Sequence, residues 1–176
     1  MVLTIGEREL AQPFRIVPPA GIAATQEDLA AQEDLLLRVR GEVDRMARTI
    51  NRMRDLRGQL DAVAKRAKAR EGGEEIAGEV EALRDTVLEL EKTLAVPDLR
   101  PGWGDTINEG ARLYEKMTGL PGAVQLGDYR PTDAAEAVFA DLKERIDPQV
   151  EAFDALVADE VPPLNKKVAD ADLGAL

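Results

Sequence analysis

LDAVAKRAKAREGGEEIAGEVEAL, residues 60–83, is the stretch that decides the fold of this chain. At its centre stands Gly72-Gly73, a pair that ends one helical pattern before another begins. On both sides of the glycines, apolar residues recur at alternating spacings of three and four, which is typical of helices that pack along a narrow seam. If the chain folds back at the glycines, Leu60 comes opposite Leu83. The stretch therefore predicts an antiparallel helical hairpin.

The same repeat extends outward through both arms, so we place the hairpin at residues 25–95. Thr25 and Asp28 have the spacing of a helix N-cap with a capping box, and no proline follows before Arg70. Reflection about the glycines pairs five seam positions of the first arm, Met53 to Ala67, with five of the second, Ile76 to Leu90, which favours a coiled-coil-like packing. The seam positions are Leu36, Val39, Val43, Met46, Ile50, Met53, Leu56, Leu60, Val63 and Ala67 in the first arm, and Ile76, Val80, Leu83, Val87, Leu90 and Leu94 in the second.

Opposite charges distinguish the two arms of the predicted hairpin. Charged pairs that flank such a seam set the partner and its orientation more than they add stability. The arginine-rich stretch 38–70 is also compatible with a nucleic-acid surface, but we favour pairing within the chain. The basic residues are Arg45, Arg48, Arg52, Arg57, Lys65, Arg66, Lys68 and Arg70, and the acidic ones are Glu74, Glu75, Glu79, Glu81, Asp85, Glu89 and Glu91.

Two further helices are expected after the hairpin. The first spans roughly residues 106–118 and ends at Leu120-Pro121-Gly122, because proline and glycine together stop a helix. The second spans residues 133–170 and carries an apolar stripe toward the core. Pro148 should kink or break this last helix, and Pro162-Pro163 should interrupt it again.

The N-terminal segment has the alternation of β-strands. We predict strands at residues 2–5 and 14–17, joined through a turn at residues 6–9. The expected organisation is a β-strand segment and linker over residues 1–20, followed by a helical bundle domain over residues 21–176. The fold class is thus mainly α, a long helical hairpin or bundle with a short N-terminal β-hairpin.

Composition excludes several classes of function. The chain of 176 residues contains no cysteine and no histidine, so it has no thiolate ligand, no cysteine nucleophile and no imidazole base. Its net charge of −11 argues against nucleic acid as a partner. No apolar run approaches the roughly 20 residues of a membrane span, and charges interrupt the N-terminus too early for a signal peptide. We expect no enzyme activity, no cofactor and no direct membrane span.

Two features leave alternatives open. Carboxylates crowd the last helix and are compatible with Ca²⁺ binding or with an acid–base pair, although we favour a solvated face that complements the basic helix. Trp103 between two glycines is either an exposed anchor or a buried plug at the end of the bundle. The carboxylates concerned are Glu144, Asp147, Glu151, Asp154, Asp159 and Glu160.

The order of several phrases resembles a known family. Residues 12–18 (QPFRIVP) precede residues 50–60 (INRMRDLRGQL), Ile107-Asn108, residues 122–125 (GAVQ) and residues 130–132 (RPT). Together they resemble the C-terminal region of bacterial sortilin-like proteins with BNR-repeat propellers, often described as glycosyl-hydrolase-like. The resemblance implies that the N-terminal strands match the last strands of a β-sandwich, that the propeller is missing from this sequence, and that the setting is periplasmic or extracellular. It carries over no catalytic residue.

We therefore predict a non-catalytic structural or protein-interaction module. In this hypothesis it is an accessory subunit that stabilises a larger envelope complex, for instance a photosynthetic or electron-transfer assembly, and associates with a membrane complex through protein contacts. The alternatives are a C-terminal fragment of a secreted propeller enzyme and a carboxylate-based hydrolase or cation binder. The candidate interaction residues are Val2, Leu3, Ile5, Phe14, Ile16 and Trp103.

Overall fold

The computed structural model describes residues 1–15, 17, 21–97 and 110–174. It confirms a mainly α-helical fold with a short N-terminal β-hairpin. The strands are β1 (Val2–Ile5) and β2 (Arg8–Ala11), and the helices are α1 (Gln26–Lys68), α2 (Glu74–Leu94), α4 (Leu113–Val124), α5 (Asp133–Asp159) and α6 (Val161–Asp170).

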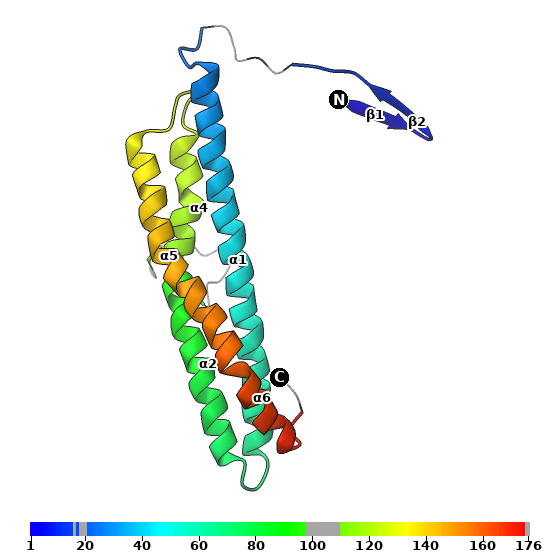
Figure 1. Cartoon of the computed structure of the whole chain (residues 1–176), viewed down its shortest axis with the longest axis vertical. Helices are drawn as coiled ribbons and strands as arrows, with labels where there is room; N and C mark the ends of the chain where they lie inside the picture. Colours follow the sequence, from blue (N-terminus) through cyan, green and yellow to red (C-terminus); the bar gives the residue numbers. More distant parts are fainter. Residues whose placement is uncertain (16, 18–20, 98–109, 175–176) are drawn as a thin grey trace.

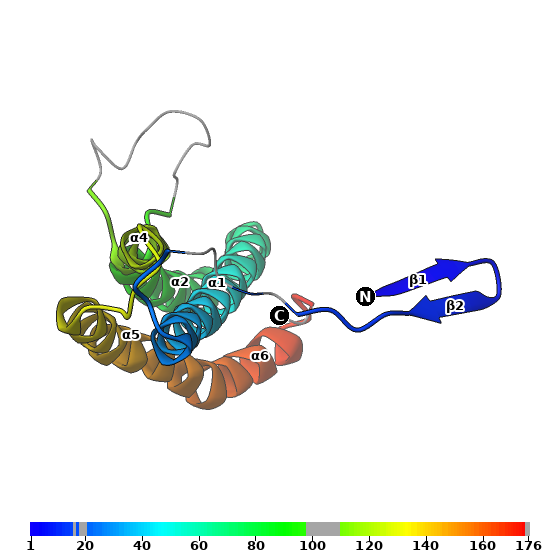
Figure 2. The same ribbon diagram turned by 90° about the horizontal axis from the view of Figure 1, so that it is seen from above.

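The helices form three columns side by side (Figure 1). The first column is α1 alone, which runs the length of the bundle. The second column is α2 followed by α4, and both run antiparallel to α1. The third column is α5 followed by α6, and it runs parallel to α1. Seen from above, the columns surround a common interior, while the strands stand to one side (Figure 2).

The start of α1 is fixed by the predicted capping box. The Thr25 hydroxyl accepts a hydrogen bond from the Asp28 backbone N–H at 3.1 Å, and the Asp28 carboxylate accepts one from the Thr25 N–H at 2.9 Å. Arg130 adds a contact of 3.0 Å to the same carboxylate. These donors hold the pKa of Asp28 at about 2, with the Thr25 hydrogen bonds as the main cause.

The turn between α1 and α2 confirms the role of the two glycines. Gly72 has a φ of +78°, which side chains on L-residues disfavour. A Cβ on Gly73 would lie 2.1 Å from the carbonyl oxygen of Ala67, so the chain can reverse here only without a side chain. α2 begins directly after this position at Glu74. The predicted antiparallel hairpin is therefore confirmed.

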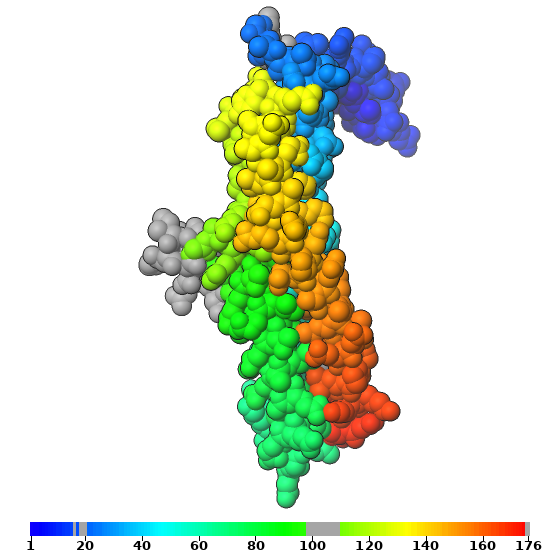
Figure 3. Space-filling view, turned by 60° about the vertical axis from the view of Figure 1, so that its left-hand side comes forward, coloured from blue at the N-terminus to red at the C-terminus, as the bar shows by residue number. Residues whose placement is uncertain are grey.

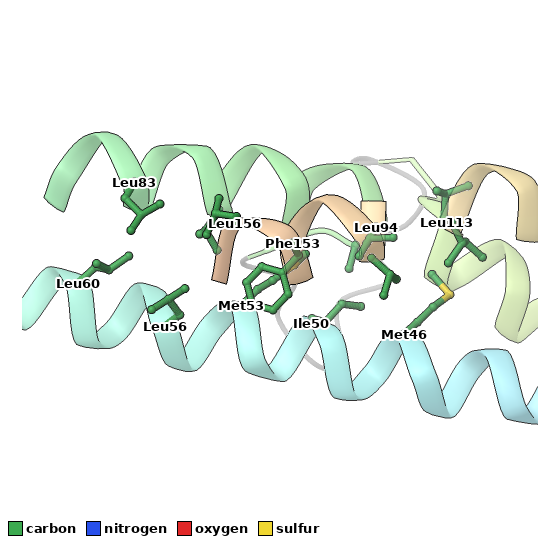
Figure 4. Packing of buried hydrophobic residues seen from close by; sticks show 14 of the residues in the cluster. Met46, Ile50, Met53, Leu56, Leu60, Leu83, Leu94, Leu113, Phe153 and Leu156 are labelled. Carbon is green, nitrogen blue, oxygen red and sulfur yellow. The ribbon is translucent and has the colours of Figure 1, made fainter. Parts of the chain in front are cut away.

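The hairpin seam is buried, and α5 closes it from a third side. Leu60 and Leu83 face each other across the two arms, and farther along the seam Phe153 and Leu156 of α5 pack between α1 and α2 (Figure 4). Most of the predicted seam lies in this core. Its confirmed members are Val39, Met46, Ile50, Met53, Leu56, Leu60, Val63, Ala67, Val80, Leu83, Val87 and Leu94.

At several positions the predicted seam is displaced by one residue. Leu35, Ala77 and Glu91 are buried, whereas the two-helix pattern predicted burial of the adjacent residues Leu36, Ile76 and Leu90. A straight helix has 3.6 residues per turn rather than 3.5, and a third column widens the buried stripe, so residues beside the seam also become interior. The predicted seam residues that are only partly buried are Leu36, Val43, Ile76 and Leu90.

Ion pairs join α1 to α2 at two of the predicted charge positions. Lys68 pairs with Glu81, and Arg57 Nε lies 3.2 Å from Glu91 Oε2. The first pair is largely exposed, so it directs the pairing of the arms more than it stabilises them. The opposite charges of the arms therefore do meet, near the turn and again near the C-terminal end of α2.

The basic stripe farther up α1 faces a different helix from the one predicted. Arg45 pairs with Asp147 and Arg52 with Asp154, both on α5, so the prediction that these arginines face the second arm is wrong. The guanidinium of Arg52 also lies 5.1 Å from the ring centroid of Phe153. The pattern of two helices could not reveal this contact, because α5 lies far away in the sequence. Pairing of the arginines within the chain, the interpretation favoured over nucleic acid, is confirmed for both.

The shorter helix differs from its predicted bounds. Residues 106–109 of the predicted helix 106–118 lie outside the described residues, and the observed helix α4 begins only at Leu113. It then passes through Pro121 and ends at Val124, so the predicted stop at this proline is wrong. A proline removes one backbone hydrogen bond, and burial of the apolar residues on either side of it compensates for that loss here.

The predicted last helix, residues 133–170, is divided in two. Pro148 lies inside α5 without breaking it. Helix α5 ends at Asp159, and α6 begins at Val161. Pro162 and Pro163 lie in the first turn of α6, where a missing N–H costs little. The predicted interruption by these two prolines is confirmed.

Candidate interaction surface

The two strands form an antiparallel ribbon with a two-residue turn. Gly6 has a φ of +59°, the conformation that a type II′ hairpin turn requires at its first central position. The register places Leu3 opposite Leu10 and Ile5 opposite Arg8. The predicted second strand at residues 14–17 is therefore wrong, because the tight turn brings residues 8–11 back first.

One face of the ribbon carries three large aliphatic side chains beside Arg8, and this face is uncovered. Residues opposite each other in an antiparallel pair share a face, and alternate residues of one strand do as well. Leu3, Ile5 and Leu10 therefore lie together, and their exposed fractions are 54%, 62% and 61%. The other face carries the polar residues Thr4 and Glu9 together with Val2 and Ala11. A contiguous exposed patch of large aliphatic side chains is typical of an interaction site.

Both edges of the ribbon are open for backbone pairing. The backbone groups of Met1 and Gln12 exchange two hydrogen bonds of 3.0 Å. Since bonded and non-bonded pairs alternate in an antiparallel ladder, the N–H and C=O groups of Val2 and Thr4 point outward on one edge. Those of Glu9 and Ala11 point outward on the other. Such groups need water or another strand as their partner.

The predicted interaction residues have different outcomes. Val2, Leu3, Ile5 and Phe14 are all exposed, with Val2 on the opposite face from Leu3 and Ile5. Ile16 and Trp103 lie outside the described residues. Leu10 was not predicted from the sequence, because the charged residues Arg8 and Glu9 before it interrupt the alternation of apolar residues that indicates a strand. A test of Gly6 as the first position of a two-residue turn would have found it, since that turn places Leu10 across from Leu3.

Two of the six carboxylates predicted on the last helix, Asp147 and Asp154, form ion pairs with arginines of α1, so the favoured interpretation that they complement the basic helix is confirmed for these two. The Lys143 ammonium and the Arg45 guanidinium hold the pKa of Asp147 below its ordinary value. Asp154 pairs with Arg52 at 2.8 Å. Across residues 1–15, 17, 21–97 and 110–174, no three carboxylates cluster closely enough to hold a metal ion. No helix in this part of the chain is long and apolar enough to cross a membrane.

A buried carboxylate holds the middle of the bundle together. Glu91 is completely buried, and its Oε1 accepts a hydrogen bond of 2.6 Å from Arg54 Nε. Its Oε2 lies 3.2 Å from Arg57 Nε, but these two atoms are poorly aligned and neither has a hydrogen-bond partner among the described residues. We infer that this buried charge helps to set the register of α1 against α2, because the two helices must align for the charges to meet.

Comparisons with known proteins do not identify the role of this surface, so its interpretation depends on its geometry. The similarity of phrases to the propeller proteins stays a prediction. The features that carry an interpretation are the apolar face of Leu3, Ile5 and Leu10 and the two open strand edges. Comparison of the chain with family models, curated proteins and solved structures gives no significant match.

Proposed function

We propose that this chain is a non-catalytic protein-interaction module that attaches through its N-terminal ribbon and holds its helical bundle out as a rigid spacer. The observation that carries the proposal is the uncovered apolar face of Leu3, Ile5 and Leu10 on a ribbon whose edges are both open. A two-stranded ribbon is marginal on its own and gains stability when it joins a larger sheet. The partner we propose is a protein with a free sheet edge, which the ribbon extends by strand addition.

The size of the face sets the expected strength of this attachment. Complete burial of a leucine or isoleucine contributes about 1.5–3 kcal/mol, and these three side chains are already nearly half covered. Their burial therefore contributes on the order of 3 kcal/mol, to which main-chain pairing adds. Association itself costs at least about 4 kcal/mol. The ribbon supports weak binding alone, so a lasting complex needs a second contact on the bundle.

The proposed setting is a larger envelope complex on the periplasmic side, such as a photosynthetic or electron-transfer assembly, which the chain stabilises as an accessory subunit. The alternative proposal is a C-terminal piece of a secreted propeller enzyme, in which the ribbon completes a preceding β-sandwich. Both proposals use the same face of the ribbon. The mass of the native polypeptide in its source separates them, because a propeller adds several hundred residues.

A pair of variants tests the attachment. Leu3→Asp with Leu10→Asp places two charges on the apolar face, while Thr4→Asp with Ala11→Asp places the same charges on the opposite face of the same strands. The chain, tagged at its C-terminus, is expressed in its source, and its partners are captured and quantified by mass spectrometry. We expect the first variant to lose the partner that the parent and the second variant retain. Equal retention by both variants would remove the ribbon face from the proposal.

A further inference from the structure

A basic groove crosses the middle of this acidic chain. It lies where the end of α2, the start of α4 and the middle of α5 meet (Figure 3). The groove has a volume of about 610 Å³, and four cationic side chains line it with a single carboxylate, that of Glu89. The cations are Lys92, Arg112, Lys116 and Arg145. A local excess of three positive charges is notable in a chain whose net charge is −11.

Two of these cations have ion-pair partners within the described residues, and two do not. Arg145 lies 3.4 Å from Asp141 on its own helix. Lys92 pairs with Glu89 at 2.6 Å, and its place in the last turn of α2 suits the helix dipole. Arg112 and Lys116 have no ion-pair partner within the described residues. They stand at the N-terminal end of α4, where the positive end of the helix dipole disfavours a cation. Among the described residues, ion pairing and the helix dipole therefore give no electrostatic reason for either cation.

The distribution of the cations around the groove favours an extended anion over a single ion. All four cations are on the surface and come from three different helices, so no single anion is enclosed by buried donors. Exposed charge pairs contribute little individually, and a ligand gains affinity here only by contacting several at once. An extended segment with several carboxylates meets this requirement. We propose that the groove binds an acidic segment of a protein partner, as a second contact beside the ribbon.

The proposal is tested by fluorescence anisotropy with the full chain and a fluorescein-labelled octaglutamate peptide. The groove variant is Arg112→Glu with Lys116→Glu, and the matched control is Lys65→Glu with Lys166→Glu, two exposed cations elsewhere that give the same change in net charge. The reversal should leave the helix intact, because anions suit the first turn of α4. If circular dichroism shows unfolding, Lys92→Gln with Arg145→Gln replaces it.

We expect the parent to bind octaglutamate, more weakly as salt rises, and the groove variant to bind at least tenfold more weakly. The control should bind within about twofold of the parent, because exposed charges are screened beyond about 10 Å. Absence of binding by the parent overturns the proposal, and so does an equal loss in the control, which would mean that net charge alone acts. Displacement of the peptide by inorganic phosphate or by an oligothymidylate at an equal charge concentration also overturns it, since the ligand would then not be an acidic polypeptide. A failure here leaves the ribbon experiment unaffected.

Discussion

Replacement of Glu91 by leucine should destabilise the bundle by about 3 kcal/mol, because it leaves two arginines without their buried counterion. Removal of one member of a buried ion pair costs about 3–5 kcal/mol. Arg54 is 43% exposed and can turn toward water, whereas Arg57 is only 21% exposed and stays largely desolvated. We therefore place the loss at the lower end of the range. The double variant Glu91→Leu with Arg57→Leu should recover most of this lost stability, since an apolar cluster of similar volume replaces the charges.

The assay is urea unfolding followed by helical circular dichroism, with the slope of the transition checked for two-state behaviour. Glu89→Leu is the matched control on the same helix, because Glu89 is 71% exposed and its pair with Lys92 contributes about 0–1 kcal/mol. A neutral Glu91→Leu, or equal losses in the two variants, would refute the reasoning that Glu91 is a buried registration charge.

Gly73→Ala should destabilise the chain, because the new Cβ would lie 2.1 Å from a backbone carbonyl oxygen. In Gly78→Ala the new Cβ meets nothing within 4 Å, so this variant should stabilise α2 by roughly 0.5–1 kcal/mol. Thermal melting of both variants checks the two predictions. Asp28 has its pKa lowered from 3.8 to about 2, so its stabilising effect is complete above pH 3.8 and disappears as the pH falls through 2. The difference in melting temperature between the parent and Asp28→Asn should therefore shrink to zero over this window, and a difference that persists below it contradicts the cap. Leu60→Ala and Leu83→Ala should each lower the free energy of unfolding by about 2–5 kcal/mol. In a double-mutant cycle their effects should depart from additivity by about 0.5–3 kcal/mol, and strict additivity would mean that the two side chains do not touch.

Local chemistry made the helical hairpin predictable. The Thr25 cap and the Gly72-Gly73 turn act over a few residues, and the sequence shows all the groups concerned. The seam could also be predicted, because the two arms are close in sequence and reflect about one turn. The period and spacing of the apolar residues are enough to predict which side of each arm faces the interior.

Contacts between distant segments were not predictable in the same way. Arg45 and Arg52 meet α5 across about one hundred residues. The sequence indicated that the carboxylates of the last helix complement the basic helix, but the individual pairs with Asp147 and Asp154 follow only from the folded bundle. Pro121 stays inside a helix because tertiary packing outweighs its local preference. The candidate surface was found in part: the sequence indicated the apolar residues of β1, but the face depends on Leu10, whose position follows from the turn.

Amide hydrogen exchange of the ribbon, in the intact chain alone and with the partner captured from its source, is the measurement that tests the central claim most directly. Strand addition uses one edge, so we expect the N–H groups of Val2 and Thr4, or those of Glu9 and Ala11, to become protected in the complex while the other pair stays open. Helical amides remote from the contact should keep their rates. Unchanged exchange on both edges, together with new protection confined to the helices, would contradict attachment through the ribbon.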